Sequence, residues 1–382
     1  MNTETVKGFR DFDSEEAEKR AEIKRILTDT FEKYGFEPAE TPLIESEEFV
    51  KGENERDEAV SDIFKLKDKG QRNLALRYEF TFQLKRLAKN KKLPYKRYEI
   101  GEVFRDEPVS SNRFRQFTQC DVDIVGGSIK EEAEILSIAK KILDTLGIKF
   151  TIYINNRKLL NEILEKEKIT ENREQIIREI DKMDKLSEKE ISENLKKYNA
   201  EKVIKIFKNP ESYFKKYEYY AEIEELAKYC RYYGVKASFL PSLARGFSYY
   251  NGSVFEIKTN EIKETITAGG SYSVNGISST GISFGLDRIS SLAKIKNKRE
   301  KIMLVSLGED KKTIEMAEKI REKKICLIYY GKPSKALEYA DSKKIDKVIF
   351  VGKEEIKKKK FKIKDMKTGK EKYINIKDFD KI

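Results

Sequence analysis

Hydrophobic and polar positions follow patterns that predict both helices and strands. In residues 13–34 apolar side chains recur near helical spacing, Asp13 can cap the helix, and Glu16 follows three residues later. A second helix is expected over residues 129–146, between a capping-box pattern at its start and a glycine at position 147.

Between these helices lie two runs with strand character, residues 95–104 and residues 116–125, separated by a long polar loop. This arrangement is typical of an antiparallel hairpin. Two later runs, residues 252–259 and residues 281–284, also have strand character, and the second leads into a helical pattern over residues 286–294. Strands of an antiparallel sheet flanked by helices indicate an α+β fold.

A long segment without strand patterns interrupts this body. Residues 158–235 are dense in Lys and Glu, with scattered Ile, Leu and Tyr. We interpret this segment as a helical insertion, which divides the body into a first part over residues 1–157 and a second part over residues 236–299. The chain length of 382 residues agrees with more than one domain.

The last part of the chain, residues 300–382, alternates apolar strands with helices, which predicts a small α/β module with parallel strands. A terminal hairpin is expected at the run Lys357–Lys360 and the turn Thr368-Gly369. Residues 301–382 hold 24 basic and 14 acidic side chains, so they carry +10 of the net charge of +12. A basic module on a nearly neutral body is typical of a domain that binds a polyanion, and a lysine-rich solvated surface is the alternative.

Composition excludes several classes of protein. The chain contains no histidine, which excludes catalysis by an imidazole base and imidazole metal ligands. Cys120, Cys230 and Cys326 are far apart in the sequence, so we expect neither a disulfide framework nor a metal site. No apolar run is long enough to span a membrane, and the first residues lack the pattern of a signal peptide. A cytoplasmic protein without membrane contact is therefore expected.

Six segments in order carry a resemblance to one family. They are Lys7–Phe12, Thr41–Leu43, Leu76–Thr81, Phe104–Asp121, Arg245–Tyr250 and Gly281–Arg288. Together they resemble the histidyl-tRNA synthetase family, in its archaeal and eukaryotic form. The resemblance implies a class II synthetase fold, with an antiparallel sheet flanked by helices, a helical insertion and a C-terminal anticodon-binding domain over residues 300–382. It also implies a homodimer built on motif 1 at Thr41–Leu43.

The implied reaction suits a chain without histidine. An amino-acid carboxylate attacks the α-phosphate of ATP, so no general base is required, and arginines and Mg²⁺ bound to ATP stabilise the developing charge. By resemblance, Arg105 faces the α-phosphate, Arg288 holds the γ-phosphate, and Arg245 approaches the α-phosphate from the other side. The other residues expected to contact ATP are Glu107, Gln119 and Gly285.

Selection of L-histidine requires polar partners at both ends of the imidazole ring, since unpaired buried polar groups reject other substrates. Asp123 and Tyr250 are the candidates for the ring nitrogens. The remaining candidates are Glu79, Phe80, Thr81 and Gln119 around the α-amino and carboxylate groups, and Tyr249 and Tyr272 along the wall. The partners implied are L-histidine, ATP and tRNA(His), with histidyl-adenylate as the intermediate.

Two segments depart from the family pattern. The family has Leu-Asp where this chain has Phe247-Ser248, and Gly-Gly-Arg-Tyr-Asp where it has Gly269-Gly270-Ser271-Tyr272-Ser273. We hypothesise that the lost charges interact in relatives and were lost together, because removal of a whole buried charged set can be nearly neutral. The motif 2 loop is also acidic at Asp106 and Glu107, which weakens its expected grip on tRNA.

Three alternatives stay open at this point. The first is the regulatory paralogue of ATP phosphoribosyltransferase, which usually lacks the anticodon domain and often the arginine at position 245. The second is another class II synthetase of the same subgroup, for glycine, proline or threonine. The third is a catalytically inactive RNA-binding pseudo-synthetase, which the serine substitutions would favour.

Overall fold

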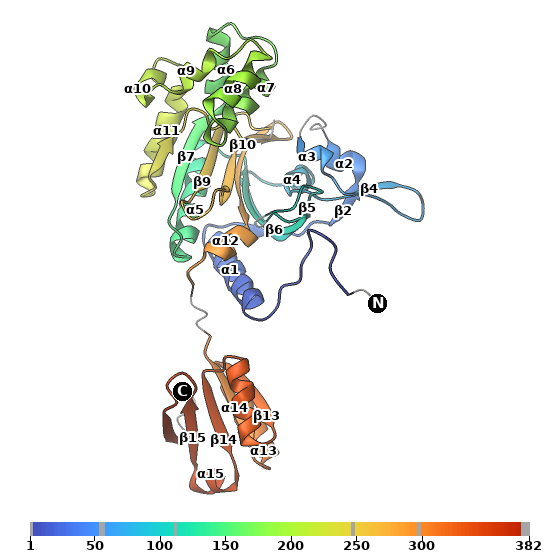
Figure 1. The fold of residues 1–382 in the computed structure, drawn as a ribbon, viewed down its shortest axis with the longest axis vertical. Coiled ribbons are helices and arrows are strands. Elements are labelled where there is room, and N and C mark those ends of the chain that lie inside the picture. Colours follow the sequence, from blue (N-terminus) through green and yellow to red (C-terminus); the bar gives the residue numbers. More distant parts are fainter. Residues whose placement is uncertain (1–2, 53–57, 111–112, 246–248, 296–298, 376–382) are drawn as a thin grey trace. The chain divides into compact units, whose positions relative to one another are not determined.

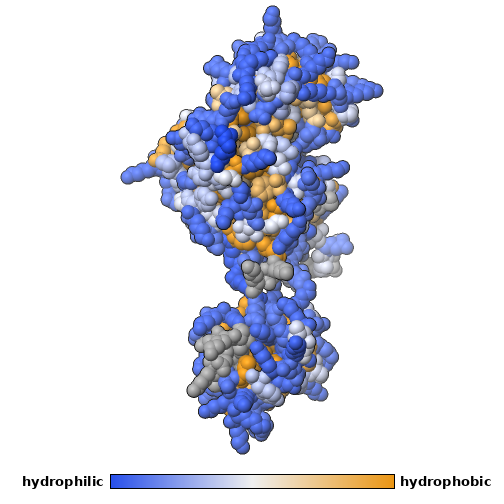
Figure 2. Space-filling view, turned by 90° about the vertical axis from the view of Figure 1, so that its left-hand side faces the viewer, coloured by the Kyte–Doolittle hydropathy of each residue, from blue (hydrophilic) through white to orange (hydrophobic). Residues whose placement is uncertain are grey.

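The computed structural model describes residues 3–52, 58–110, 113–245, 249–295 and 299–375, and the chain divides into two compact units, Met1–Ile295 and Lys296–Ile382 (Figure 1). The face of each unit that Figure 2 shows is mostly hydrophilic, in keeping with a chain in which 38% of the residues are charged. Among the described residues no helix is long and apolar enough to cross a membrane.

The first unit is built on an eight-stranded sheet with the order β1-β5-β6-β11-β10-β9-β7-β8. Its strands are β1 (Glu37–Pro38), β5 (Tyr95–Phe104), β6 (Gln116–Val125), β7 (Thr151–Asn156), β8 (Ala237–Phe239), β9 (Ser253–Lys258), β10 (Thr267–Val274) and β11 (Ile277–Gly285). The pairs β1–β5 and β7–β8 are parallel and the other pairs are antiparallel. The predicted α+β fold is confirmed, and β5 and β6 have the predicted bounds.

Strand β10 was not among the predicted strands, because its sequence is rich in glycine and serine, which have low strand propensity. Tertiary pairing overrides this preference, since β10 lies between β9 and β11 and pairs with both.

One face of the sheet is covered by helices α1 (Ser14–Lys33), α5 (Ile129–Thr145), α11 (Tyr220–Tyr232) and α12 (Leu286–Leu292) (Figure 1). Side chains in a strand alternate between the two faces. In β6 the apolar Cys120, Val122 and Ile124 are buried in the core that these helices share. The polar Gln119, Asp121 and Asp123 therefore point to the opposite face.

Helix ends test the predicted capping signals. At α5 the capping box of Ser128 and Glu131 forms, and Gly147 has a φ of +67°, as expected of a glycine that ends a helix. At α1 the predicted cap is wrong. Within the described residues Asp13 makes no side-chain cap hydrogen bond, and the side chain of Glu16 pairs with Arg10.

The segment between β7 and β8 is helical, as predicted. It consists of α6 (Arg157–Lys166), α7 (Arg173–Ile180), the 3-10 helix η1 (Asp181–Asp184), α8 (Glu188–Lys196), α9 (Val203–Phe207), α10 (Glu211–Phe214) and α11. Because β7 and β8 are paired, the segment leaves and re-enters the same edge of the sheet. The domain boundaries at 157/158, 235/236 and 299/300 stay predictions.

A small region adjoins the sheet ahead of β5. It contains β2 (Ile44–Ser46), α2 (Glu47–Lys51), α3 (Glu58–Ser61), β3 (Lys65–Lys67), β4 (Asn73–Leu76) and α4 (Thr81–Leu87). The three strands form their own sheet in the order β2-β4-β3. Residues 77–81, which connect β4 to α4, carry several of the candidate site residues.

The second unit has a five-stranded sheet with the order β13-β12-β14-β15-β16. Its elements are β12 (Lys301–Ser306), α13 (Asp310–Arg321), β13 (Ile325–Tyr330), α14 (Pro333–Ser342), β14 (Lys347–Val351), α15 (Lys353–Lys358), β15 (Lys360–Asp365) and β16 (Glu371–Asn375). Strands β13, β12 and β14 are parallel, as predicted. The terminal hairpin forms, but most of the run Lys357–Lys360 precedes it, since Lys357 and Lys358 end α15.

Candidate active site

A cavity of about 630 Å³ opens on the face of the sheet opposite the helices. Its floor comes from β6, β10 and β11, and its walls come from residues 79–81, the motif 2 segment and the segments before β9 and β10. Twelve of the thirteen candidate residues line it. They are Glu79, Thr81, Arg105, Glu107, Gln119, Asp123, Arg245, Tyr249, Tyr250, Tyr272, Gly285 and Arg288.

Phe80 is the exception, and the structure corrects its assignment as a residue that contacts histidine. Phe80 is fully buried and is not among the residues that line the cavity. Its ring lies 4.5 Å from the guanidinium carbon of Arg77 and 5.9 Å from that of Arg97, and its carbonyl accepts a hydrogen bond from Arg97. The hydrophobic ring thus packs behind the cavity wall and supports two buried arginines.

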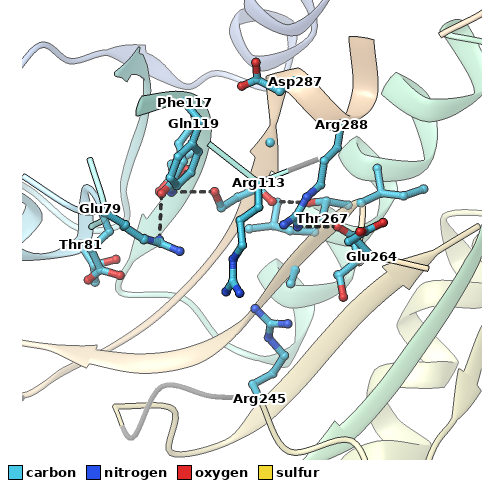
Figure 3. Close-up of a pocket in the computed structure, with 18 of the residues that line it drawn as sticks. Glu79, Thr81, Arg113, Phe117, Gln119, Arg245, Glu264, Thr267, Asp287 and Arg288 are labelled. Atoms are coloured by element: carbon cyan, nitrogen blue, oxygen red, sulfur yellow. Dashed lines mark hydrogen bonds between the residues drawn. The ribbon is translucent and has the colours of Figure 1, made fainter. Parts of the chain in front are cut away.

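Four arginines line the cavity: Arg105, Arg113, Arg245 and Arg288. Figure 3 shows Arg113, Arg245 and Arg288 converging from three different segments of the chain. Burial lowers the pKa of Arg288, and the positive charges of Arg113 and Arg105 lower it further. A concentration of partly buried guanidinium groups is expected where a polyanion binds.

Arg105 follows the last residue of β5 and is held by two hydrogen bonds. Its Nε donates to the carbonyl of Tyr78 at 3.2 Å, and its Nη2 donates to Oε1 of Gln119 at 3.2 Å. Glu107 lies near Arg105, with 3.9 Å between Nη1 and Oε1, and pairs more closely with Arg113. The acids of the motif 2 loop are therefore balanced within the loop, since Arg115 likewise pairs with Asp106 at 3.0 Å.

Arg245 has an unusual backbone conformation. Its φ is +63°, in the left-handed region that a residue with a side chain rarely adopts. The backbone N–H groups of Ala244 and Arg245 both donate to Oδ1 of Asp181, at 2.9 and 3.0 Å. Asp181 belongs to η1, in the helical segment between β7 and β8. A carboxylate from that segment thus holds the backbone that aims Arg245.

The side chain of Arg245 is held from a second direction. Its Nη1 pairs with Oε1 of Glu256 at 3.3 Å, and Glu256 pairs in turn with Lys258 at 3.0 Å. Burial acts to lower the pKa of Arg245, but the nearby oxygens of Tyr250 and Glu256 outweigh the effect of burial, so the pKa is raised. The Nε group of Arg245 is buried without a hydrogen-bond partner among the described residues, so a donor remains for a ligand.

Arg288 is positioned by the first turn of α12. Its Nη1 donates to the carbonyl of Thr265 at 2.8 Å. Its neighbour Asp287 accepts hydrogen bonds from Arg20 at 2.8 Å and from the backbone N–H of Thr118 at 3.3 Å. Because Arg20 belongs to α1 and Thr118 to β6, the start of α12 is fixed to both elements.

Three buried carboxyl groups also line the cavity: Glu79, Asp121 and Asp123. Burial raises the pKa of Glu79 to about 8. Burial and the neighbouring Asp123 raise the pKa of Asp121 to about 7, and burial also raises the pKa of Asp123. Oε1 of Glu79 has no hydrogen-bond partner among the described residues, while Oε2 accepts one from Tyr249 at 3.3 Å. These groups need a cationic or donating ligand.

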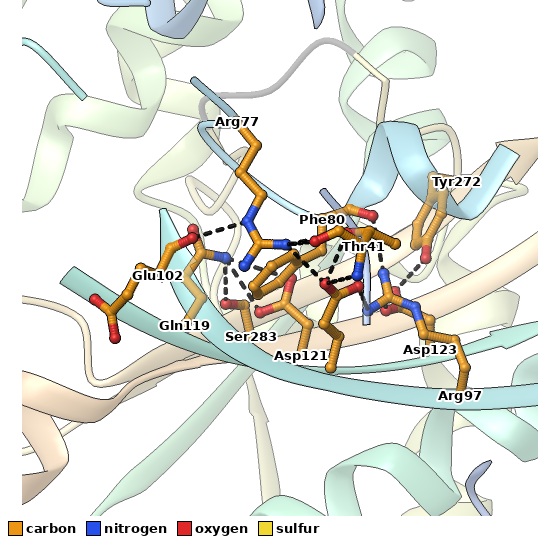
Figure 4. A network of polar contacts seen from close by, with 11 residues as sticks. Thr41, Arg77, Phe80, Arg97, Glu102, Gln119, Asp121, Asp123, Tyr272 and Ser283 are labelled. Carbon is orange, nitrogen blue, oxygen red and sulfur yellow. Dashed lines mark hydrogen bonds and ion pairs between the residues drawn. The ribbon is translucent and has the colours of Figure 1, made fainter. Parts of the chain in front are cut away.

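A buried ionic network supports these carboxyl groups (Figure 4). Arg97 lies between Asp123, at 3.1 Å, and Glu99, at 3.6 Å, and Glu99 also pairs with Arg77 at 2.9 Å. Tyr272 donates a hydrogen bond to Oδ1 of Asp123. Because removal of one member would leave a buried charge unpaired, the network fixes the position of Asp123.

Two glycines allow the floor of the cavity to be tightly packed. A side chain at Gly281 would place its Cβ 1.9 Å from Oδ1 of Asp123, which lies opposite it on β6. A Cβ at Gly270 would lie 2.8 Å from the ring of Tyr250. The rings of Tyr249 and Tyr250 lie 4.8 Å apart, and Tyr249 also contacts Tyr272. The three tyrosines form an aromatic wall beside the carboxyl groups.

Sequence reasoning missed three residues at this site. Asp121 lies on the same face of β6 as Gln119 and Asp123, so the period of two in the strand was a sufficient signal for it. Arg113 lies within the motif 2 segment but was not selected. Asp181 had no signal, because a carboxylate in a helical insertion gives no indication of what it contacts.

The serine departures can be placed in part. Residues 246–248 lie outside the described residues, and with them Gly246, Phe247 and Ser248. Ser273 is exposed, and Ser271 faces away from Tyr272 and donates a hydrogen bond to the buried Glu132 of α5. Position 271 thus faces an acid that this chain retains, which a joint loss of all the interacting charges does not explain.

Among the described residues no group of three or more Cys, Asp or Glu side chains is placed to hold a metal ion. The three cysteines are free and buried, and burial raises the pKa of each thiol.

Known proteins resemble the chain over nearly its whole length. Residues 8–289 match the profile of the family described as histidyl-tRNA synthetase, and residues 300–382 match the profile described as anticodon binding domain. Histidine–tRNA ligase 1 of Bacillus cereus is 36% identical, over 97% of this chain and 95% of that protein. Histidine–tRNA ligase of Clostridium acetobutylicum is 33% identical, over 94% of each. Both are bacterial proteins, so the expected archaeal or eukaryotic form finds no support in them.

Solved structures agree in fold. Histidyl-tRNA synthetase from a Nostoc species superposes with a TM-score of 0.87 and 24% identity, over 100% of this chain and 99% of that chain. A protein described as an ATP phosphoribosyltransferase regulatory subunit/histidyl-tRNA synthetase, from Bacillus halodurans, gives a TM-score of 0.77 and 21% identity, over 91% and 98%. The first similarity includes the C-terminal module.

Proposed function

Because the chain belongs to the histidyl-tRNA synthetase family, we propose that its cavity joins L-histidine to ATP and presents histidyl-adenylate to tRNA(His). The family membership makes the chain a histidine–tRNA ligase, an aminoacyl-tRNA synthetase. The assignment of individual residues to this reaction rests on the geometry of the cavity, as follows.

The four arginines of the cavity would bind ATP with its Mg²⁺. Arg105 and Arg245 reach the cavity from opposite walls, so an α-phosphate between them would be contacted from both sides. Arg288 would hold the γ-phosphate, with Glu107, Gln119 and Gly285 near the nucleotide. Charge on the α-phosphate increases as the histidine carboxylate attacks and pyrophosphate leaves, and guanidinium groups that are already in place stabilise it without reorganisation.

The carboxyl groups of the cavity would bind histidine. The unpartnered Oε1 of Glu79 is suited to the α-ammonium group, with Thr81 and Gln119 beside it. Asp123 and Tyr250 would meet the two ring nitrogens, while Tyr249 and Tyr272 cover the ring. Because these polar groups are buried, a side chain that left them unpaired would bind poorly.

One observation carries the proposal. A single cavity is lined by four arginines and three buried carboxyl groups, which suits a polyphosphate beside a cationic amino acid. The test is histidine-dependent exchange of pyrophosphate into ATP by the purified protein. Exchange is expected with histidine and not with glycine, proline or threonine. A protein without exchange would instead be a pseudo-synthetase or a regulatory paralogue, and neither alternative is favoured.

We also propose a homodimer built on the segment around motif 1. Thr41 is tied to the buried network, since it donates a hydrogen bond to Glu99 and accepts one from Arg77. Next to it, Leu43 and Ile44 are 46% and 49% exposed, which is high for large apolar residues. A second copy would cover them and stabilise the network behind the cavity. Sedimentation at micromolar concentration tests this, and a species of only 44.6 kDa would contradict it.

A further inference from the structure

A second cavity, of about 620 Å³, lies on the helix-covered side of the sheet, behind the histidine pocket. Side chains of β10 and α5 contribute to it, together with residues 251–253. Ser271 and Tyr272 are neighbours on β10 and face opposite sides, so this cavity and the active site are separated by one strand. None of the residues that line this second cavity is used in the proposed reaction.

The wall of this cavity contains a buried carboxyl group with an unsatisfied atom. Glu132, on α5, is 6% exposed. Its Oε1 accepts a hydrogen bond from Ser271, and its Oε2 is buried without a hydrogen-bond partner among the described residues. Leaving a buried acceptor unpaired costs roughly 1–3 kcal/mol, and more when the group is charged.

The basic residues of the cavity are not available to neutralise Glu132. Lys158 is bound to Glu222, with 2.7 Å between Nζ and Oε1. The Nζ group of Lys130 lies 5.8 Å from the ring centre of Tyr229. The acids Glu222 and Glu225 also line the cavity, so its carboxyl groups outnumber its lysines.

Burial raises the pKa of Glu132 to about 7, and the charge of Glu222 adds to this effect, while Ser253, Ser271 and Lys158 oppose it. At neutral pH the site therefore exchanges between a neutral acid and an uncompensated carboxylate. A cation at Oε2 would stabilise the carboxylate and displace the proton.

The other walls favour a cation with hydrogen-bond donors. They consist of hydroxyl, amide and backbone groups, contributed by Gly127, Ser128, Asn251, Gly252, Ser253, Ser271 and Ser278. A metal ion usually requires several charged or carbonyl ligands around one point, and the three acids of this cavity are not grouped around one point. A planar guanidinium or a primary ammonium can instead bind one carboxylate and several neutral acceptors.

We propose that this cavity binds a small nitrogen cation, a guanidinium or primary ammonium group, against Oε2 of Glu132. The cation is either a free ion or the end of a small metabolite. The site exists because position 271 carries a short hydroxyl side chain, which leaves space in front of the carboxyl group.

The experiment uses the full-length protein and guanidinium chloride at 0–20 mM, with sodium chloride at equal ionic strength as the reference. For a dissociation constant near 1 mM, the thermal midpoint of the wild type is expected to rise by roughly 2–4 °C over this range, and above about 1 mM the rise should follow the logarithm of the guanidinium concentration. Tetramethylammonium has the same charge without N–H donors and is expected to produce no rise. Calorimetry at pH 7 in two buffers of different ionisation enthalpy is expected to show release of roughly half a proton per site.

Two variants separate the site from general salt effects. Glu132→Gln removes the charge and Ser271→Arg supplies a tethered guanidinium, so both are expected to lose the rise in thermal midpoint and the proton release. Ser273→Arg, an exposed position on the same strand, is the matched control and is expected to retain both. The proposal is overturned if the wild type responds no more than Glu132→Gln and Ser271→Arg, or if tetramethylammonium matches guanidinium. The two variants are independent tests of the site. If Glu132→Gln does not fold, Ser271→Arg alone decides whether the cation binds at Glu132.

Discussion

The contact between Asp181 and the backbone of residues 244–245 leads to the sharpest prediction. Asp181 accepts two N–H hydrogen bonds at a point where Arg245 adopts a φ of +63°. Asp181→Ala removes the acceptor and leaves the backbone free to relax. The guanidinium of Arg245, which we place at the α-phosphate, would then lose its fixed direction. Asp181 is in this sense a positioning residue.

The magnitude follows from the two contacts. Hydrogen bonds to a charged group contribute about 1.5–3 kcal/mol each, and a residue with a side chain in the left-handed region costs about 1–3 kcal/mol. Without Asp181 the left-handed conformation is no longer compensated. A displacement of about 1 Å of a catalytic group can lower a rate about 100-fold. We expect kcat for pyrophosphate exchange to fall about 30-fold to 100-fold, which corresponds to about 2–3 kcal/mol.

The assay is pyrophosphate exchange with kcat and the KM for histidine measured separately. The KM is expected to change less than threefold, because Asp181 is not near the carboxyl groups that hold histidine. Glu179→Ala is the matched control. Glu179 also belongs to the helical segment and accepts two hydrogen bonds, from Lys182 and Asn194. It should leave kcat within twofold.

A double-mutant cycle separates positioning from general loss of stability. Arg245→Ala alone is expected to lower kcat about 100-fold to 1000-fold. If Asp181 acts through Arg245, Asp181→Ala should have little further effect in the Arg245→Ala background. Effects that multiply would refute the reasoning, because Asp181 would then act by another route.

Three further predictions concern the histidine pocket and the C-terminal unit. Burial raises the pKa of Glu79 to about 8, so binding of an ammonium group should release a proton, and histidine affinity should rise ~5-fold from pH 7 to pH 8. Calorimetry at both pH values measures this affinity. An equal pH dependence in Glu79→Gln would contradict the prediction. Asp123→Asn should raise the KM for histidine about tenfold or more, with the KM for ATP unchanged, because a ring nitrogen loses a charged partner; steady-state exchange kinetics provide the measurement, and an unchanged histidine KM would remove Asp123 from the pocket. A protein ending at Arg299 should retain pyrophosphate exchange but charge tRNA poorly, and full-length tRNA affinity should fall steeply with salt; unchanged aminoacylation by the truncated protein would exclude an anticodon-binding role.

The parts of the fold that could be predicted from sequence are those whose pattern is local. Strands β5 and β6 alternate polar and apolar residues, and the capping signals of α5 are contained in its own ends. Strand β10 could not be predicted, because its glycines serve close packing against Phe255 and Tyr250 rather than strand propensity.

The candidate site divides in the same way. Residues such as Arg105 and Arg288 stand in recognisable segments, so their approach to one cavity could be expected. Asp181 could not, because it is brought to Arg245 only by the folding of the helical segment. Phe80 shows a different failure, since a residue next to two that line a cavity can itself point into the packing behind it.

The strand order of the first unit also bears on the synthesis of the protein. Strand β6 pairs with β11, yet about 150 residues separate Val125 from Ile277, which a ribosome takes roughly 8–30 s to add. Throughout that interval one side of β6 has no partner, and it carries the buried acids of the pocket on one face and apolar residues on the other. An open strand edge of this kind is prone to pair with another chain. We therefore expect the nascent polypeptide to be most prone to aggregate during this interval, with the early folding of α5 covering the apolar face of β6 but not its open edge.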